Sequence, residues 1–69
     1  MDAVEKELQS RKNEIQKELE LLFKANMRIT DWDVPEADDN KAAIILSGIM
    51  QEALDTIKRD IQEGKYNDY

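Results

Sequence analysis

Residues 42–61 (AAIILSGIMQEALDTIKRDI) hold the largest run of apolar side chains in the chain. At the 3.6-residue period of an α-helix, these side chains fall on one side and cover about half of the circumference. They are Ala42, Ile45, Leu46, Ile49, Met50, Ala53, Leu54, Ile57 and Ile61. A coiled-coil seam is narrower than this face. The stretch is therefore expected to form a helix that needs two neighbours to cover it.

A first helix is predicted over residues 2–27, which contain neither Gly nor Pro. Asp2 followed by Glu5 is typical of an N-cap with an acidic first turn. The apolar residues here form a narrower stripe, made of Val4, Leu8, Ile15, Leu19 and Leu22. The narrow stripe indicates a peripheral helix that packs along the second one.

Charged residues interrupt the stripe of the first helix at Arg11 and Lys12. We expect their aliphatic stems to lie along the seam while their charges reach water. The alternative is an ion pair that sets the pairing of the helices. Antiparallel packing would place Arg11 opposite Asp60, which makes Asp60 its expected partner.

Residues 30–39 (TDWDVPEADD) lack helical periodicity and are predicted to connect the two helices. They hold five acids, the only Pro and the only Trp of the chain. Acids here are suited to cap the second helix, predicted over residues 38–63. Gly64 is suited to end it, followed by a short tail at 65–69.

These elements predict a single all-α domain over residues 1–69, an antiparallel two-helix hairpin that dimerises into a four-helix bundle. An apolar face left uncovered on one chain indicates an interface. The residues expected in this interface are Leu46, Ile49, Met50, Ala53, Leu54, Ile57 and Ile61. A possible second patch consists of Trp32, Ile44, Ile45 and Gly48. Trp32 is expected to cap the bundle, and the alternative is that it anchors a partner.

Composition disfavours most chemical functions. The chain has no Cys and no His, so it offers no disulfide, no ordinary zinc ligands and no histidine base. We expect no enzymatic activity, no cofactor and no metal. The five acids of residues 30–39 do not match the spacing of a calcium-binding loop, and helix capping explains them better.

The formal net charge of −6 disfavours direct binding to nucleic acid or to an anionic membrane. No apolar run approaches the ~20 residues of a membrane span, and a cytoplasmic location is the default expectation. We therefore predict a non-enzymatic helical module that self-associates or serves as a small subunit of a larger complex. The alternative is an acidic inhibitor that mimics nucleic acid and blocks a basic groove. Salt would weaken the second mode of binding steeply and the first mode little.

Overall fold

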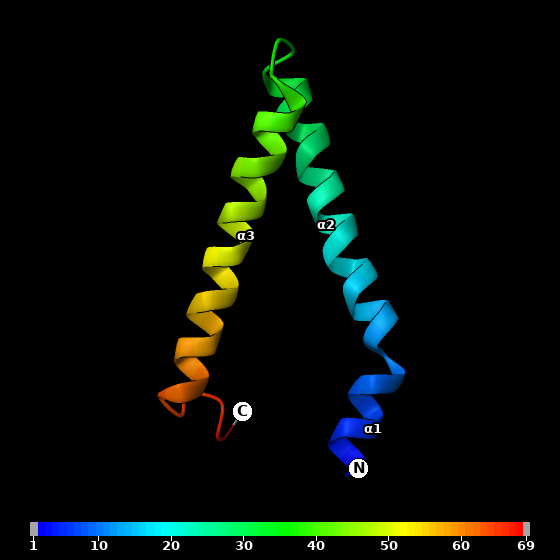
Figure 1. The fold of residues 1–69 in the computed structure, drawn as a ribbon, viewed down its shortest axis with the longest axis vertical. Helices are drawn as coiled ribbons and strands as arrows, with labels where there is room; N and C mark the ends of the chain where they lie inside the picture. Colours follow the sequence, from blue (N-terminus) through cyan, green and yellow to red (C-terminus); the bar gives the residue numbers. More distant parts are fainter. Residues whose placement is uncertain (1, 69) are drawn as a thin grey trace.

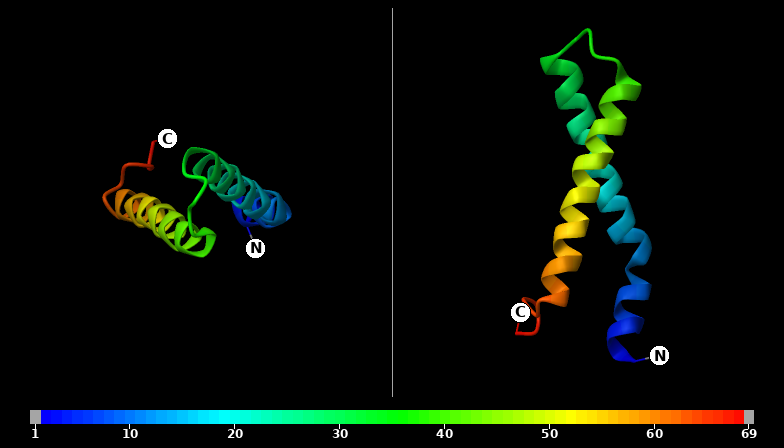
Figure 2. Two further views of the ribbon diagram at one scale, coloured as in Figure 1. Left: turned by 90° about the horizontal axis from the view of Figure 1, so that it is seen from above. Right: turned by 60° about the vertical axis from the view of Figure 1, so that its left-hand side comes forward.

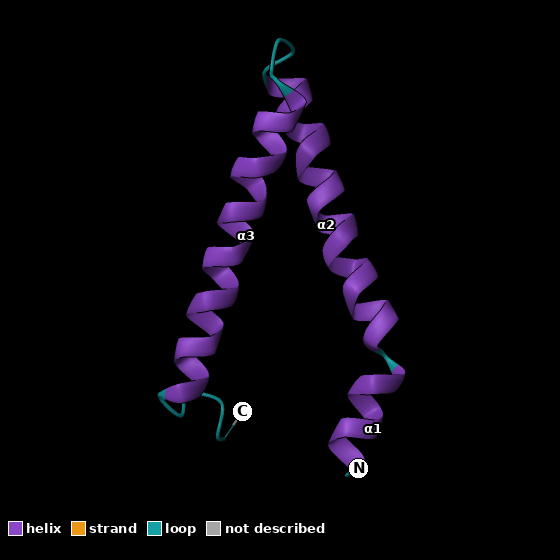
Figure 3. Ribbon diagram, viewed as in Figure 1, coloured by secondary structure: helices purple, strands orange, loops and turns teal. Residues whose placement is uncertain are grey.

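The structure is a computed structural model that describes residues 2–68, and it contains three α-helices (Figures 1 and 3). They are α1 (Ala3–Ser10), α2 (Lys12–Asp33) and α3 (Asp39–Gln62). No strand occurs between residues 2 and 68. The all-α prediction is confirmed, whereas the prediction of one uninterrupted helix over residues 2–27 is wrong.

The first half of the chain is divided at Arg11, where the helix is interrupted by a single turn residue. Its amide donates to the Leu8 carbonyl oxygen three residues back, at 3.2 Å, which is the bond of a tighter helical turn. The Ser10 hydroxyl also donates to the Glu7 carbonyl oxygen, at 2.8 Å. Residues 9–13 are all polar and exposed. Because no tertiary packing supports the helix here, local side-chain bonds are sufficient to interrupt it.

Helix α2 continues to Asp33, so the connection is confined to residues 34–38 and is shorter than predicted. The Val34 amide still donates to the Thr30 carbonyl oxygen, at 2.8 Å. Pro35 then prevents further helix, because it lacks an amide proton and restricts the residue before it. Trp32 consequently belongs to α2 and not to the connection.

The caps of the helices agree with the sequence. The Asp2 carboxylate accepts from the Glu5 amide at 2.8 Å. The Asp38 carboxylate accepts from the amides of Asn40 and Lys41 at 3.0 and 3.2 Å, and thereby starts α3. Gly64 follows the C-cap residue Glu63 of α3 and has a φ of +80°, as predicted for a C-terminal glycine.

Helices α2 and α3 run antiparallel, extend to the same side of the connection at residues 34–38, which we call the turn, and spread apart toward the chain ends (Figures 1 and 2). Their shared contact lies near the turn, and the half-buried residues there are Phe23, Ala25, Asn26, Met27, Thr30, Ala37, Ala42, Ala43, Leu46 and Met50. None of the described residues is fully buried. The radius of gyration is 16.0 Å, against about 11 Å for a compact chain of this length. The described chain therefore has no closed core of its own.

The predicted ion pair between Arg11 and Asp60 is not present. Arg11 pairs with Glu7 at 3.9 Å and with Glu14 at 3.7 Å, both on its own side of the molecule. Asp60 pairs with Lys65, which approaches it at 3.2 Å from the residues after α3. The helices are too far apart at this end for the predicted pair, and the nearest opposite charges are local. Tyr69, the last residue of the predicted tail, lies outside the described residues.

Among residues 2–68, no helix has the length and apolar character needed to cross a membrane.

Candidate protein-interaction surface

The predicted interface residues lie along α3 and remain accessible. Ile49, Leu54, Ile57 and Ile61 are exposed, and the exposed fraction of Ile49 is 57%. Leu46 and Met50 are half-buried by the contact with α2, while Ala53 is exposed. The turn half of the predicted face is thus partly covered within the chain. In the other half, Ile57 and Ile61 are 43% and 56% exposed.

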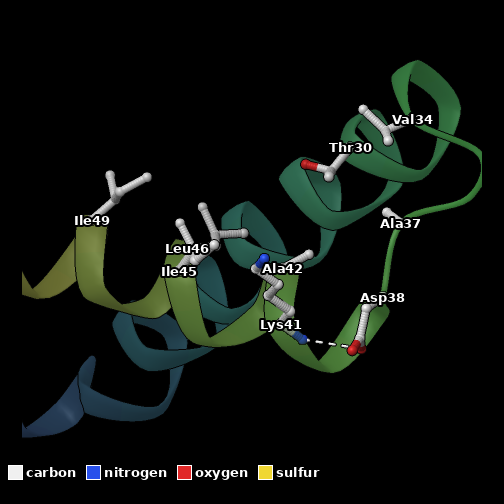
Figure 4. A pocket seen from close by; sticks show the side chains of 9 residues that line it. All are labelled: Thr30, Val34, Ala37, Asp38, Lys41, Ala42, Ile45, Leu46 and Ile49. Carbon is white, nitrogen blue, oxygen red and sulfur yellow. Dashed lines mark hydrogen bonds between the residues drawn. The ribbon is translucent and has the colours of Figure 1, made fainter.

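A groove of about 450 Å³ lies where the end of α2, the turn and the beginning of α3 meet (Figure 4). Its lining is mainly apolar and consists of Thr30, Val34, Ala37, Asp38, Lys41, Ala42, Ile45, Leu46 and Ile49. Ala42, Ile45, Leu46 and Ile49 are spaced as successive turns of one helical face. The groove therefore presents a ridge of α3 to a potential partner. We call it the turn groove.

A second hollow, of about 330 Å³, lies further from the turn between α2 and α3. Leu19 and Phe23 of α2 line it together with Met50 and Leu54 of α3. Ile49 does not line this hollow and lies in the turn groove instead. The two hollows therefore use different sides of the apolar face of α3.

The residues of the predicted second patch have different surroundings. Ile45 lines the turn groove, whereas Ile44 and Gly48 line neither hollow. A Cβ atom added at Gly48 would have no neighbour within 4 Å. Trp32 is 86% exposed, so it does not cap the contact between α2 and α3 in this chain.

Sequence reasoning missed three residues of the turn groove and one residue of the apolar stripe of α2. Thr30, Val34 and Ala37 line the turn groove although they were assigned to a connection without further role. In addition, the exposed Ile29 follows Ile15 and Leu22 of the predicted stripe at a spacing of seven residues, which places all three on one side of α2. The seven-residue spacing was visible in the sequence. The groove residues could not be recognised, because their proximity to α3 depends on the path of the turn.

Residues 31–39 hold five acids and no base, and account for most of the net charge. Within residues 2–68, all ion pairs lie elsewhere, and none of them neutralises these five carboxylates. The neighbouring Asp39 carboxyl group, through a hydrogen bond and charge repulsion, raises the pKa of Asp31. The turn is therefore a site of unbalanced negative charge.

The acids of the turn have two different settings. Asp38 and Asp39 lie at the N-terminus of α3, where the helix dipole stabilises negative charge. Asp31 and Asp33 lie in the last turn of α2, which contains no base, and the helix dipole disfavours acids there. No group of three or more metal-ligating side chains occurs among the described residues.

Comparison with family models, with curated proteins and with solved structures found no match to this chain.

Proposed function

We propose that this protein is a non-enzymatic helical assembly module that self-associates through the apolar face of α3. Two copies would form a four-helix bundle in which the α3 face of one chain covers that of the other. The same face can instead serve a different helical protein, which would make the chain a small subunit of a larger complex.

The observation that carries this proposal is the amount of surface that the single chain leaves uncovered. Its accessible surface is 6222 Å², whereas a compact monomer of 8.0 kDa exposes about 4,500 Å². The excess of about 1,700 Å² is larger than the ~800 Å² that each partner contributes to a stable interface. Much of the excess surface is apolar, because large aliphatic residues of α1, α2 and α3 are exposed. A chain with this surface gains stability by burying it against another helix pair.

Sedimentation velocity over a concentration series tests the proposal. We expect the wild-type chain to sediment as a dimer or larger assembly that dissociates on dilution. Ile49→Asp should abolish the assembly and most of the helicity, because a carboxylate buried in an apolar interface costs several kcal/mol. That cost is comparable to the whole stability of a small domain.

Ile44→Asp is the matched control for Ile49→Asp. Ile44 lies on the same helix and is 63% exposed, but it lines neither hollow. We expect this variant to keep the wild-type assembly. A folded wild-type monomer at all concentrations, or equal losses in both variants, would contradict self-association through the α3 face.

A further inference from the structure

We infer that the turn groove binds a basic amphipathic helix of another protein. The apolar side of this helix would occupy the groove, and its Lys and Arg side chains would reach the carboxylates of the turn. The inference shares with the proposed function the premise that the protein binds other proteins, and it does not require self-association. It adds a surface that shares Leu46 and Ile49 with the proposed interface and extends beyond it to Ala42, Ile45 and the turn, and it adds the chemistry of the partner.

The shape of the turn groove suits a helix. Ile45 and Ile49 are 53% and 57% exposed, and together with Ala42 and Leu46 they form one ridge of α3. Val34 and Ala37 bound the groove on the side of the turn (Figure 4). A helix that lies alongside this ridge can pack its own side chains on either side of it. Apolar residues one helical turn apart on the partner would be its anchors in the groove.

The groove lining holds one acid, Asp38, and one base, Lys41. The other four acids of residues 31–39 lie within two residues of the lining in the sequence, so the net charge around the groove is negative and favours a basic partner. Asp38 and Asp39 are explained by the start of α3, but Asp31, Asp33 and Glu36 have no such role. Asp31 and Asp33 oppose the dipole of α2, and no base in its last turn offsets them. A Lys or Arg brought here by a partner would interact with these acids and with the C-terminal end of the α2 dipole.

A second copy of this chain fits the turn groove poorly. Antiparallel pairing of residues 46–61 with themselves ends at Leu46 and leaves Ala42, Ile45 and the turn outside the overlap. A copy shifted to cover the groove would bring a chain of net charge −6 against five carboxylates. Like charges placed together in this way are destabilising. A basic partner avoids this repulsion and can bind at Ala42, Ile45 and the turn, with Leu46 and Ile49 at the border, while the part of α3 beyond Ile49 remains in the assembly.

Fluorescence titration tests the inference, because Trp32 is the only Trp and is 86% exposed beside the acidic turn. The probe is a synthetic amphipathic helix that contains leucine and lysine and no Trp. The control peptide has glutamate at each lysine position. We expect saturable binding of the lysine peptide with a blue shift of Trp32 emission, weakening as salt is raised. The glutamate peptide should not bind.

Two pairs of variants test whether binding uses this groove. Ile45→Ser should weaken binding of the lysine peptide about tenfold, whereas Ile44→Ser, the same change outside the groove, should alter it less than about twofold. The triple change Asp31→Asn, Asp33→Asn and Glu36→Gln should weaken it about tenfold and reduce the salt dependence. The control triple Glu5→Gln, Glu18→Gln and Glu52→Gln makes the same change in net charge away from the turn.

Absence of binding by the lysine peptide would overturn the inference, as would binding of the glutamate peptide with similar affinity. Equal losses in the groove and control variants would overturn it as well, because they would indicate attraction to the whole acidic chain. Sedimentation of the same samples shows whether the chain self-associates, and thereby tests the proposed function separately from peptide binding. A monomer that binds the lysine peptide through the groove would support the inference and contradict self-association. A dimer that does not bind the lysine peptide would support self-association and contradict the inference.

Discussion

Single residues of this protein are mostly governed by their immediate neighbours. Asp2 caps a helix in the structure as predicted, and Asp38 is the one among several candidate acids that caps the second helix. Arg11 forms local ion pairs with Glu7 and Glu14, although an ion pair with Asp60 was predicted. Local bonds could be anticipated because only the helical spacing decides them. A bond between helices requires that the helices be close, which residue type does not determine.

Asp31 makes the turn sensitive to pH. Because the pKa of Asp31 is raised above its ordinary value of 3.8, the folded state binds a proton there more tightly than the unfolded chain. This contribution to stability is full below the unfolded pKa and is lost as pH rises through the folded pKa. We therefore expect Asp31→Asn to raise the melting temperature at pH 7, by a few degrees at most. The advantage should disappear as the pH falls below about 4.

Thermal denaturation at several pH values, followed by circular dichroism, measures this effect. Asp33→Asn is the control, because it removes the same charge from the same helical turn. Equal gains in the two variants would indicate relief of the α2 dipole alone, without a specific effect of Asp39.

Individual helices of this protein are defined largely by their ends. The end of α3 forms a complete capping motif, in which the amide of Gly64 donates to the Ile61 carbonyl and that of Lys65 to the Asp60 carbonyl. The hydrogen bond from Lys65 to the Asp60 carboxylate raises the pKa of the Lys65 ammonium. The break between α1 and α2 is the element that the sequence did not predict. The helix breaks at Arg11 because no other described part of the chain packs against it there. The apolar stripe of the sequence had suggested continuous packing along this helix.

The two glycines lead to opposite expectations for the same substitution. Gly64→Ala should destabilise the chain by about 1 kcal/mol, because Gly64 has a φ of +80° and a new Cβ would lie 3.0 Å from Asn67 Nδ2. Gly48→Ala should stabilise it by up to about 1 kcal/mol, because Gly48 lies inside α3 with open space around it.

Chemical denaturation of both glycine variants at one protein concentration measures these changes. Sedimentation of Gly48→Ala at the same concentration should show an unchanged assembly. A destabilised Gly48→Ala with loss of assembly would indicate that a partner helix packs directly against Gly48.

The whole molecule is an open hairpin, in which α1 and α2 form one arm, α3 forms the other, and the two arms are in contact near the turn. Since the described residues bury no apolar side chain fully, folding and association are expected to be coupled. We expect the helical circular dichroism signal of the wild type to fall on dilution. Ile49→Asp should give a weak signal that does not depend on concentration. A wild-type signal that stays constant across the dilution series would show that the single chain is stable alone.

The sequence alone determined that the chain is helical, where α3 begins and ends, and which side of α3 is apolar. These properties follow from residue spacing and from caps a few residues apart, so they need no knowledge of distant contacts. Only the tertiary structure decided that α2 and α3 spread apart and that Trp32 is exposed. It also decided that Thr30, Val34 and Ala37 meet Ile45 and Ile49 in one groove. These features depend on the path of residues 34–38, because a small change of angle at the turn becomes a large separation at the far ends of long helices.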